Sequence, residues 1–430
     1  MTTLLPVLIS RIRSSNATVS VLGLGRVGLP LSVVFANSGL TCYGVDINYE
    51  TVSQINQGKV PFRENKLEKH LRKAQESGRF YATTDTVESV SKADIVMVTV
   101  GTPTTAQNYA DYSQLKSALE KITEVNLRGK AIGFRCTMTP GTTKNLIMPC
   151  LEKKSGLKAG KDFALAMCPE RILEGCALDE LYDLPEIVGG INDISNEIFA
   201  ELFKKINQKK NILHTTPTGA ELAKLFTNIC RYVSFALANE FAIWSEMYGE
   251  DAHNIIKVAN HGYPRSNIPK PGFAGGPCLG KDGFLLDNNT TFSSITSTAW
   301  KLNEAIPQHV AESLRRKLSL LYGKRISVLG VAFKAGSDDV RLSPCVKLVE
   351  ILKGYGATVL VHDPYVPNTL TLDRALENPD VVVIAINHPE FSRLAKEIDE
   401  SNCKIVYDVW GIFDAIDFKK ASYMRLGRGT

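Results

Sequence analysis

The sequence of 430 residues lacks several features that mark other classes of protein. It has no apolar run long enough to span a bilayer: the opening apolar stretch, Thr3–Ser10, is far too short, and we expect a short leading helix there. It also has no low-complexity tract and no internal repeat of solenoid length. These absences predict a globular protein with no membrane partner.

The nine cysteines contain no C-x-x-C pair, which argues against a zinc ribbon or a thioredoxin-like site, and we expect no metal. Scattered cysteines without a signal peptide fit a reducing compartment, so we expect a cytoplasmic location. The formal net charge of +5 is small for this length, and no Lys/Arg cluster is interleaved with aromatic residues. The sequence therefore predicts no nucleic-acid partner, while an acidic small ligand remains compatible with it.

Buried β-branched runs alternate with helical patterns, which predicts an α/β fold of two or three domains. The first expected strands are Val19–Leu22, Thr41–Val45, Ile95–Val100 and Lys130–Arg135. From about Ala220 to Ala259, apolar residues recur at helical spacing, which favours a bridging and dimerising helix. A second α/β pattern follows, with strands expected at Ile326–Leu329, Thr358–His362, Val381–Ala385 and Lys404–Val409, and a helix at Pro344–Gly354.

The predicted architecture is two Rossmann-like doubly wound parallel sheets joined by a central helical dimerisation domain. The expected domains are 1–205, 206–310 and 311–430.

A glycine-rich turn after the first strand, Gly23–Gly28, reads G-x-G-x-x-G, and Asp46 ends the next strand. In this context the glycines permit the turn, the approach of a pyrophosphate and close helix packing. Asp46 would bind ribose hydroxyls and repel a 2′-phosphate, so we predict NAD rather than NADP. The alternative is a glycine turn that binds no nucleotide. The residues expected at NAD are Gly23, Gly25, Arg26, Val27, Gly28, Asp46 and, in a loop after a later strand, Thr102.

The segment Gly275–Asp282 places Cys278 in a Gly/Pro-rich loop close to Lys281 and Asp282. Small neighbours allow a substrate to approach, and cationic neighbours lower a thiol pKa toward the reactive range. Taken alone, the loop leaves a catalytic thiol and a buried structural thiol equally open.

An ordered set of motifs covers nearly the whole chain and resembles the nucleotide-sugar 6-dehydrogenase family, which includes UDP-glucose, UDP-N-acetylglucosamine and UDP-N-acetylmannosamine dehydrogenases. The set comprises Gly23–Gly28 with Asp46, Thr137–Thr142, Cys168–Arg171, Glu221–Asn228, Gly275–Asp282, Phe333-Lys334 and Asp339–Ser343. The resemblance implies oxidation of a sugar C6 alcohol to a carboxylate with two NAD, in polysaccharide biosynthesis. It also implies that the last domain binds UDP.

The resemblance assigns roles to the matching residues. Cys278 would hold the intermediate as a thiohemiacetal and then a thioester. Lys224 and Asn228, one helical turn apart, would stabilise charge on the C6 oxygen. Asp282 and Thr137 would hold a water, and Glu170 would serve as acid/base in thioester hydrolysis. Arg341 would close over NAD, and Thr137 would also lie at the cofactor. The expected substrate-binding residues are Arg171, Ile172, Lys224, Asn228, Arg231, Tyr263, Arg265, Gly275 and Lys334.

The loop carrying Arg265 is expected to reach the neighbouring subunit of a homodimer or higher homo-oligomer. Glucose-type enzymes usually have an arginine where this chain has Trp410, so we predict UDP-N-acetyl-D-mannosamine as substrate. UDP-N-acetylglucosamine and then UDP-glucose remain the alternatives. A non-catalytic NAD-binding regulator built on this fold is the alternative from another class. A single-step hydroxyacid dehydrogenase would need neither the cysteine nor a UDP-binding domain.

Overall fold

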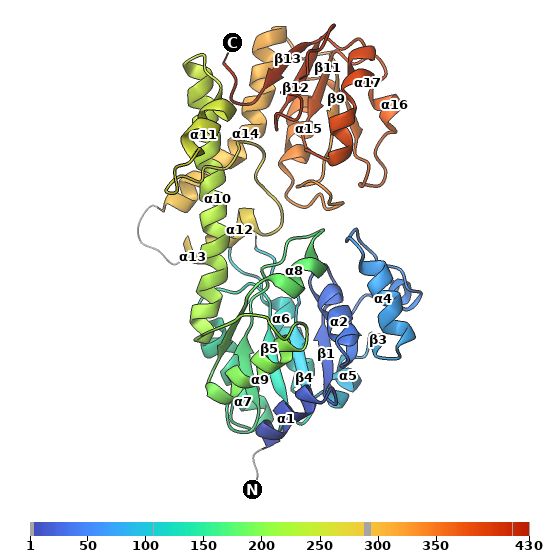
Figure 1. The fold of residues 1–430 in the computed structure, drawn as a ribbon, viewed down its shortest axis with the longest axis vertical. Helices are drawn as coiled ribbons and strands as arrows, with labels where there is room; N and C mark the ends of the chain where they lie inside the picture. Colours follow the sequence, from blue (N-terminus) through green and yellow to red (C-terminus); the bar gives the residue numbers. More distant parts are fainter. Residues whose placement is uncertain (1–3, 106, 288–293, 415, 430) are drawn as a thin grey trace. The chain divides into compact units, whose positions relative to one another are not determined.

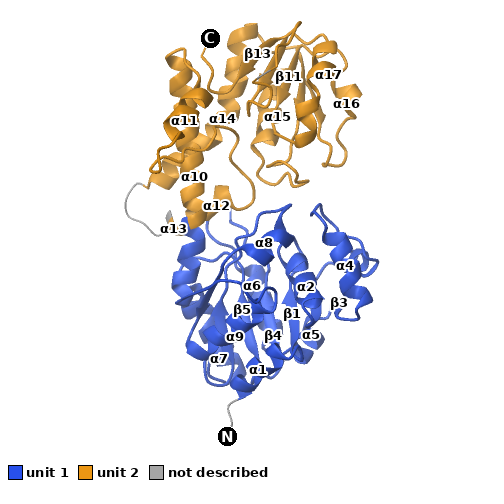
Figure 2. Cartoon of the chain, in the orientation of Figure 1, with its two compact units in different colours: residues 1–226 blue, residues 227–430 orange. Residues whose placement is uncertain are grey.

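The computed structural model describes residues 4–105, 107–287, 294–414 and 416–429. The chain forms two compact units, residues 1–226 and 227–430 (Figure 2). The domain boundaries expected at residues 205 and 310 stay predictions. No helix within the described ranges is both long and apolar enough to cross a membrane.

The first unit is built on an eight-stranded sheet with the strand order β3-β2-β1-β4-β5-β6-β7-β8. Figure 1 labels β1, β3, β4 and β5 of this sheet. Its strands are β1 (Thr18–Leu22), β2 (Thr41–Val45), β3 (Phe80–Thr83), β4 (Ile95–Val98), β5 (Ala131–Phe134), β6 (Ala164–Met167), β7 (Glu186–Gly190) and β8 (Ile212–Thr215). Neighbouring strands are parallel except β6 and β7, which run antiparallel. That reversal departs from the expected all-parallel sheet, because the segment between these two strands does not cross back over the sheet.

Helices cover both faces of this sheet, and alternate residues of each strand face opposite layers. Val19 and Val21 of β1 belong to one core and Leu22 to the other. The first layer holds α1 (Leu4–Arg13), α2 (Gly28–Asn37), α3 (Tyr49–Asn56), α4 (Leu67–Glu76), α8 (Ala177–Asp183) and α9 (Asp193–Lys204). The opposite layer holds α5 (Thr86–Lys92), α6 (Ser113–Ile122), η1 (Thr143–Ile147) and α7 (Met148–Ser155). The expected leading helix is confirmed as α1.

The helical stretch expected over 220–259 forms two helices, α10 (Pro217–Met247) and α11 (Ala252–Asn260). The break follows from local chemistry. Gly249 has φ +74°, which a helix cannot contain, and the Asp251 side chain caps α11 by accepting a hydrogen bond from Asn254 N. α10 begins in the first unit and continues into the second, where α12 (Leu279–Asp282), α13 (Phe284–Asp287) and α14 (Ile295–Leu318) follow.

The second unit contains a parallel five-stranded sheet with the order β10-β9-β11-β12-β13. Its strands are β9 (Arg325–Leu329), β10 (Thr358–His362), β11 (Val381–Ile384), β12 (Ile405–Asp408) and β13 (Ser422–Arg425). α14 and α15 (Pro344–Gly354) pack on one face, while α16 (Leu372–Ala375), η2 (Pro389–Arg393) and α17 (Ala395–Glu400) cover the other. The predicted strands and the helix Pro344–Gly354 are confirmed to within two residues, whereas β13 was not predicted because it lacks an apolar run.

Each sheet has a point where the strand order reverses, between β1 and β4 in the first unit and between β9 and β11 in the second. The loops after these strands leave the sheet in opposite directions and open a crevice, which is where ligands bind in open α/β sheets. The predicted residues of the glycine turn follow β1, Thr102 follows β4 and Lys334 follows β9.

Candidate functional site

The turn after β1 has the geometry that a dinucleotide requires. Gly23 has φ +98°, and its N–H donates to Val45 O at 2.7 Å, which ties the turn to β2. A Cβ on Gly28 would lie 1.7 Å from Gly23 O, so only glycine allows α2 to start so close to the strand. A Cβ on Gly25 would meet nothing within 4 Å, which leaves that backbone open to a ligand.

The residues around this turn fit NAD. The Asp46 carboxylate accepts from Leu24 N and Asn48 N, both at 2.9 Å, which orients the acid at the end of β2 with acceptor capacity remaining for a ribose. In the loop after β4, the Thr102 hydroxyl is buried and has no hydrogen-bond partner among the described residues. Such a group is stabilised when a ligand supplies the missing bond. Arg26 lies 3.6 Å from the Glu174 carboxylate and over the Phe62 ring.

Cys278 differs from most of the other thiols in being exposed, at the residue preceding α12. Burial raises the pKa of Cys42 and of Cys136 to about 12, so neither thiol supplies a thiolate at neutral pH. Cys176 and Cys230 are the other exposed cysteines in the described ranges; Cys176 directly precedes α8 and Cys230 lies within α10. The structure therefore removes the buried-thiol interpretation of Cys278.

Asn228 and Asp282 meet in the second unit. The Asn228 side-chain N–H donates to Asp282 Oδ2 at 2.6 Å, across 54 residues of sequence. The Lys281 ammonium lies 3.0 Å from Asp282 Oδ1, and the Asp282 side chain is fully buried. Asp282 N also donates to Cys278 O at 3.0 Å, which closes the turn that carries the thiol. The amide expected at the C6 oxygen and the acid expected at the water are thus tied to the loop that carries Cys278.

Glu170 is held in a buried ionic cluster that sequence reasoning did not predict. Arg135 Nε donates to Glu170 Oε2 at 2.9 Å, and Arg135 Nη1 donates to Glu186 Oε1 at 2.9 Å. The other Glu170 oxygen accepts from Arg171 N and Ile172 N. Burial acts to raise the pKa of Glu170, but Arg135 and these amides outweigh it and lower the pKa. The carboxylate is ionised at neutral pH, the state that a base needs.

For Glu186, burial outweighs the attraction of Arg135 in setting the pKa. The pKa of this carboxyl therefore rises to about 7. The Arg135 guanidinium therefore pairs with two carboxylates, and Glu170 stays ionised to a lower pH than Glu186. A charged residue directly after a buried strand, as Arg135 follows β5, was the signal in the sequence that could have revealed this cluster.

Lys224 is buried on the first part of α10, and its Nζ donates to the backbone oxygen of Glu170 at 2.5 Å. One turn further along the helix lies Asn228. Glu221, on the same helix, accepts from Gly141 N at 2.6 Å and from Thr143 N at 2.8 Å. These bonds anchor the loop that begins at Thr137, which is partly buried.

In the second unit, the Gly275-Gly276 segment packs against the loop that follows β9. Gly276 N donates to Leu342 O at 3.0 Å, and a Cβ on Gly275 would lie 2.5 Å from Pro344 Cδ. The close packing of the Pro344 ring thus requires glycine at position 275. Lys334 lies partly buried in the same loop. Arg341 Nε donates to both Asp339 oxygens at 3.0 Å, which holds this exposed side chain within its own loop.

Several expected substrate residues are exposed. Arg231 is exposed on α10, and Arg265 lies 4.6 Å over the ring of the exposed Tyr263 in the loop after α11. Asn260, which sequence reasoning missed, fixes that loop by accepting from Ile268 N at 3.0 Å and donating to Ile268 O at 2.8 Å. In the first unit, Arg171 and Ile172 are partly buried, and Arg171 donates to Pro185 O.

Trp410 follows β12, and its indole N–H donates to Ala385 O at 2.8 Å. A Cβ on Gly272 would lie 2.6 Å from the Trp410 ring, so the indole packs directly against the backbone that leads to Gly275. Asp408 orients this turn by accepting from Trp410 N at 3.0 Å and Gly411 N at 2.9 Å. The Trp410 side chain, which stands where glucose-type enzymes usually have an arginine, is therefore an integral part of the loop packing.

Comparison with known families matches three consecutive domains of one family to this chain. Residues 17–207 match the NAD binding domain of the UDP-glucose/GDP-mannose dehydrogenase family. Residues 218–306 match its central domain, and residues 327–415 match its UDP binding domain. The NAD binding domain covers the first sheet except β8, and the UDP binding domain covers the second sheet from residue 327 on, except β13.

Relatives match over most of their length. A UDP-N-acetyl-D-mannosamine dehydrogenase from Pyrococcus horikoshii is 36% identical, covering 87% of this chain and 90% of the relative. A solved UDP-N-acetylmannosamine dehydrogenase structure from that organism has a TM-score of 0.90 at 34% identity, covering 96% of this chain and 99% of its own. An NDP-N-acetyl-D-galactosaminuronic acid dehydrogenase from Ralstonia nicotianae is 31% identical, covering 93% and 96%. The chain therefore belongs to the UDP-glucose/GDP-mannose dehydrogenase family and is an NAD-dependent oxidoreductase of UDP-sugars.

Proposed function

We propose that this enzyme oxidises the C6 alcohol of UDP-N-acetyl-D-mannosamine to the carboxylate, with Cys278 holding the intermediate covalently. The observation that carries the chemistry is an exposed thiol whose loop is bonded to Asn228 through Asp282. The choice of sugar is supported by the relatives, since the Pyrococcus horikoshii enzyme and others from methanogens bear that substrate in their names. Trp410 in place of the arginine of glucose-type enzymes supports it as well.

The reaction removes four electrons in two oxidations, and NAD accepts one hydride in each. The alcohol first loses a hydride and a proton to give the aldehyde. The Cys278 thiol then adds to the aldehyde carbon, which forms a C–S bond and a thiohemiacetal hydroxyl. Loss of a second hydride and proton gives the thioester, and water cleaves the C–S bond to release the carboxylate and regenerate the thiol.

The remaining residues take roles that fit their environments. The Lys224 ammonium and the Asn228 amide would stabilise negative charge on the C6 oxygen. Asp282 and Thr137 would hold a water, and the ionised Glu170 would accept a proton from the water that attacks the thioester. At NAD, Asp46 would accept hydrogen bonds from the ribose, with Arg341 closing over the cofactor. Arginine and lysine suit the substrate diphosphate, and Lys334 would supply such a cation from the UDP binding domain.

A substrate panel tests this function. UDP-N-acetylmannosamine, UDP-N-acetylglucosamine, UDP-N-acetylgalactosamine and UDP-glucose are each incubated with enzyme and excess NAD, and NADH is counted per sugar consumed. We expect the largest kcat/KM with UDP-N-acetylmannosamine and two NADH per sugar. A larger kcat/KM with another sugar would replace the proposed substrate. The absence of NADH with every sugar would favour a non-catalytic regulator.

Replacing the thiol tests the covalent step. Cys278→Ser should lower turnover to the uronic acid by about a hundredfold or more, because a hydroxyl is a much weaker nucleophile toward the aldehyde. Cys176→Ser is the matched control, since Cys176 is also exposed but lies before α8. Full steady-state activity of Cys278→Ser would exclude the covalent mechanism.

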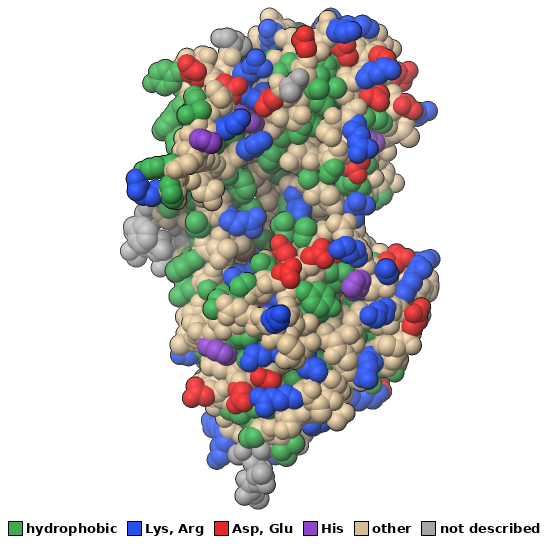
Figure 3. Space-filling model, in the orientation of Figure 1, with side chains coloured by type: hydrophobic (Ala, Val, Ile, Leu, Met, Phe, Trp, Pro, Cys, Tyr) green, Lys and Arg blue, Asp and Glu red, His purple; other side chains and the backbone are tan. Residues whose placement is uncertain are grey.

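We also propose that the enzyme works as a homodimer. Leu237, Trp244 and Met247 are exposed and spaced by seven and three residues, so they share one side of α10. Figure 3 shows hydrophobic side chains gathered where Figure 1 places α10 and α11. Such a patch suits a second copy of the same helix. Light scattering should give twice the chain mass, and Trp244→Arg should give the monomer; a monomeric wild type would contradict the proposal.

A further inference from the structure

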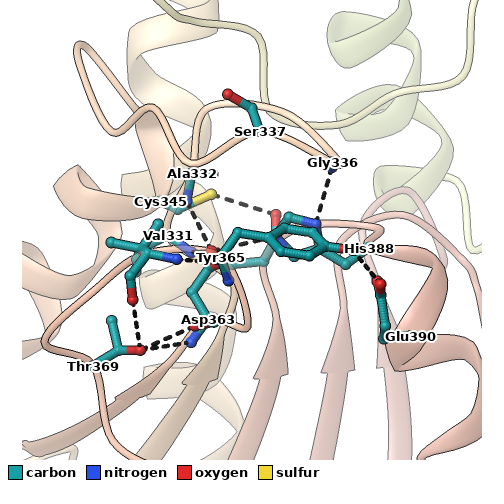
Figure 4. Close-up of polar contacts among 12 residues, drawn as sticks. Val331, Ala332, Gly336, Ser337, Cys345, Asp363, Tyr365, Thr369, His388 and Glu390 are labelled. Atoms are coloured by element: carbon teal, nitrogen blue, oxygen red, sulfur yellow. Dashed lines mark hydrogen bonds and ion pairs between the residues drawn. The ribbon is translucent and has the colours of Figure 1, made fainter. Parts of the chain in front are cut away.

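A buried aspartate and histidine of the second unit hold the loop that follows β9, residues 330–343. Asp363 follows β10 and His388 follows β11, so both lie where the strand order of this sheet reverses. Their side chains are fully buried, with His388 Nε2 3.2 Å from Asp363 Oδ2. Figure 4 shows the pair beneath the loop that carries Gly336. Neither residue belongs to the chemistry proposed above.

The hydrogen bonds assign the tautomer of His388. Gly336 N lies 3.1 Å from His388 Nδ1, and because a backbone N–H can only donate, Nδ1 is the acceptor. The proton of the neutral ring is therefore on Nε2, which donates to Asp363. Burial acts to raise the pKa of Asp363, but the bonds from His388 and from backbone amides prevail and hold it at about 2. Asp363 is thus an ionised acceptor that selects one tautomer.

The same carboxylate also binds the start of the loop. Asp363 Oδ2 accepts from Val331 N at 2.8 Å and from Ala332 N at 3.1 Å. The pair therefore contacts the loop at residues 331 and 332 and again at 336, on both sides of Lys334. Gly336 has φ +73°, which an ordinary residue rarely adopts, so the N–H is turned toward His388 by a conformation that glycine supplies.

The ring of His388 is also fixed in orientation. The Tyr365 ring meets it edge to face at 4.8 Å between centroids, and the Phe391 ring does so at 5.2 Å. The Tyr365 hydroxyl in turn donates to Glu390, as Figure 4 shows. An imidazole packed on two sides has little freedom to turn, so Nδ1 stays directed at Gly336.

We infer that His388 is a positioning residue for nucleotide binding, which holds Lys334 in place for the diphosphate by accepting the Gly336 N–H in the tautomer selected by Asp363. This inference rests on the proposed binding of UDP by the second unit. Without the bond at Gly336, the loop keeps its start but gains freedom around Lys334, while Arg341 stays bonded to Asp339 and Leu342 O to Gly276 N. The loss therefore falls on UDP affinity more than on the thiol loop or the NAD site.

Two variants separate the two bonds of the ring. In His388→Asn, the carboxamide oxygen lies near the place of Nδ1 and can accept from Gly336, but the donor to Asp363 is lost. In His388→Gln, the carboxamide nitrogen lies near the place of Nε2 and can donate to Asp363, but the acceptor for Gly336 is lost. UDP binding by the full-length protein is measured by titration calorimetry, NAD binding by fluorescence, and Tm by calorimetry.

We expect His388→Gln to raise the Kd for UDP about tenfold, and His388→Asn to raise it no more than about threefold. NAD affinity should stay within about twofold of wild type, and KM for the sugar nucleotide should rise with kcat little changed. A wild-type Kd for UDP in His388→Gln, or equal losses in both variants that follow the fall in Tm, would overturn the inference. Failure of the wild type to bind UDP would instead overturn the proposed function.

Imidazole ¹⁵N NMR of the wild-type protein gives a test that needs no variant. We expect one histidine with an unprotonated Nδ1 whose resonance shifts when UDP is added. A protonated Nδ1 on His388 would overturn the assignment even if both variants failed to fold.

Discussion

The Glu186 carboxyl should make the stability of the first unit depend on pH. Its pKa is about 7 against an ordinary value of 4.5, because burial outweighs the attraction of Arg135. The folded protein therefore holds this proton more tightly than the unfolded chain does. The resulting contribution to stability is complete below about pH 4.5 and is lost as the pH rises through about 7, which amounts to about 3 kcal/mol.

Glu170 affects stability in a different pH range from Glu186. Burial alone would raise the pKa of Glu170, but Arg135 and backbone amides lower it. A carboxyl with a lowered pKa contributes stability above its unfolded pKa and loses it as the pH falls through the folded one. Its window therefore lies below that of Glu186. Burial also raises the pKa of Glu221 and lowers that of His70, so the Glu186 contribution is read from the difference between wild type and a Glu186 variant.

Glu186→Gln removes the charge while its carboxamide oxygen can still accept from Arg135. Relative to wild type, the variant should gain about 3 kcal/mol between about pH 5 and about pH 8, or roughly 6–12 °C in Tm for a unit of this size. Thermal unfolding of both proteins across this range measures the difference. Glu197→Gln is the control, because the Glu197 side chain is 52% exposed and its surface ion pair with Arg13, at 3.7 Å, contributes little to stability. Parallel pH profiles for wild type and Glu186→Gln would refute the reasoning.

Three further variants test the neighbouring groups. Arg135→Met leaves two buried carboxylates without their cation and should lower the free energy of unfolding, measured with urea, by about 3–5 kcal/mol. A decrease below about 1 kcal/mol would show that the ionic cluster does not stabilise the fold. Asp46→Asn removes the charge that repels a 2′-phosphate, so kcat/KM with NAD divided by kcat/KM with NADP should fall about tenfold. An unchanged ratio would contradict the role of Asp46 in selecting NAD. Asp282→Asn should lower kcat by about a hundredfold with the Kd for UDP unchanged, and a purely KM effect would place Asp282 in binding instead.

Local sequence patterns are sufficient to predict the cofactor turn and many of the helices and strands of this protein. The glycine turn and Asp46 are recognisable because a dinucleotide needs small residues and an acid at set distances along one strand-turn-helix unit. The helix Pro344–Gly354 and the strand Thr358–His362 have the predicted bounds, since their apolar periods are uninterrupted. The break between α10 and α11 was also readable at Gly249 and Asp251, but the apolar period masked it.

Other features depend on strand order and register, which no local pattern specifies. Arg135 meets partners 35 and 51 residues away because β5, β6 and β7 bring their ends to the same region of the sheet. Asp363 and His388 meet because β10 and β11 flank β9 and release their chains at one edge. The antiparallel turn of β7 likewise reflects the path of the chain between strands. Spacing along the chain thus identifies the cofactor turn, and the ordered set of family motifs selects Cys278 as the candidate thiol. The buried pairs that hold Glu170 and the loop around Lys334 arise only when distant strands are assembled, because a buried charge is stable only where the fold supplies its partner.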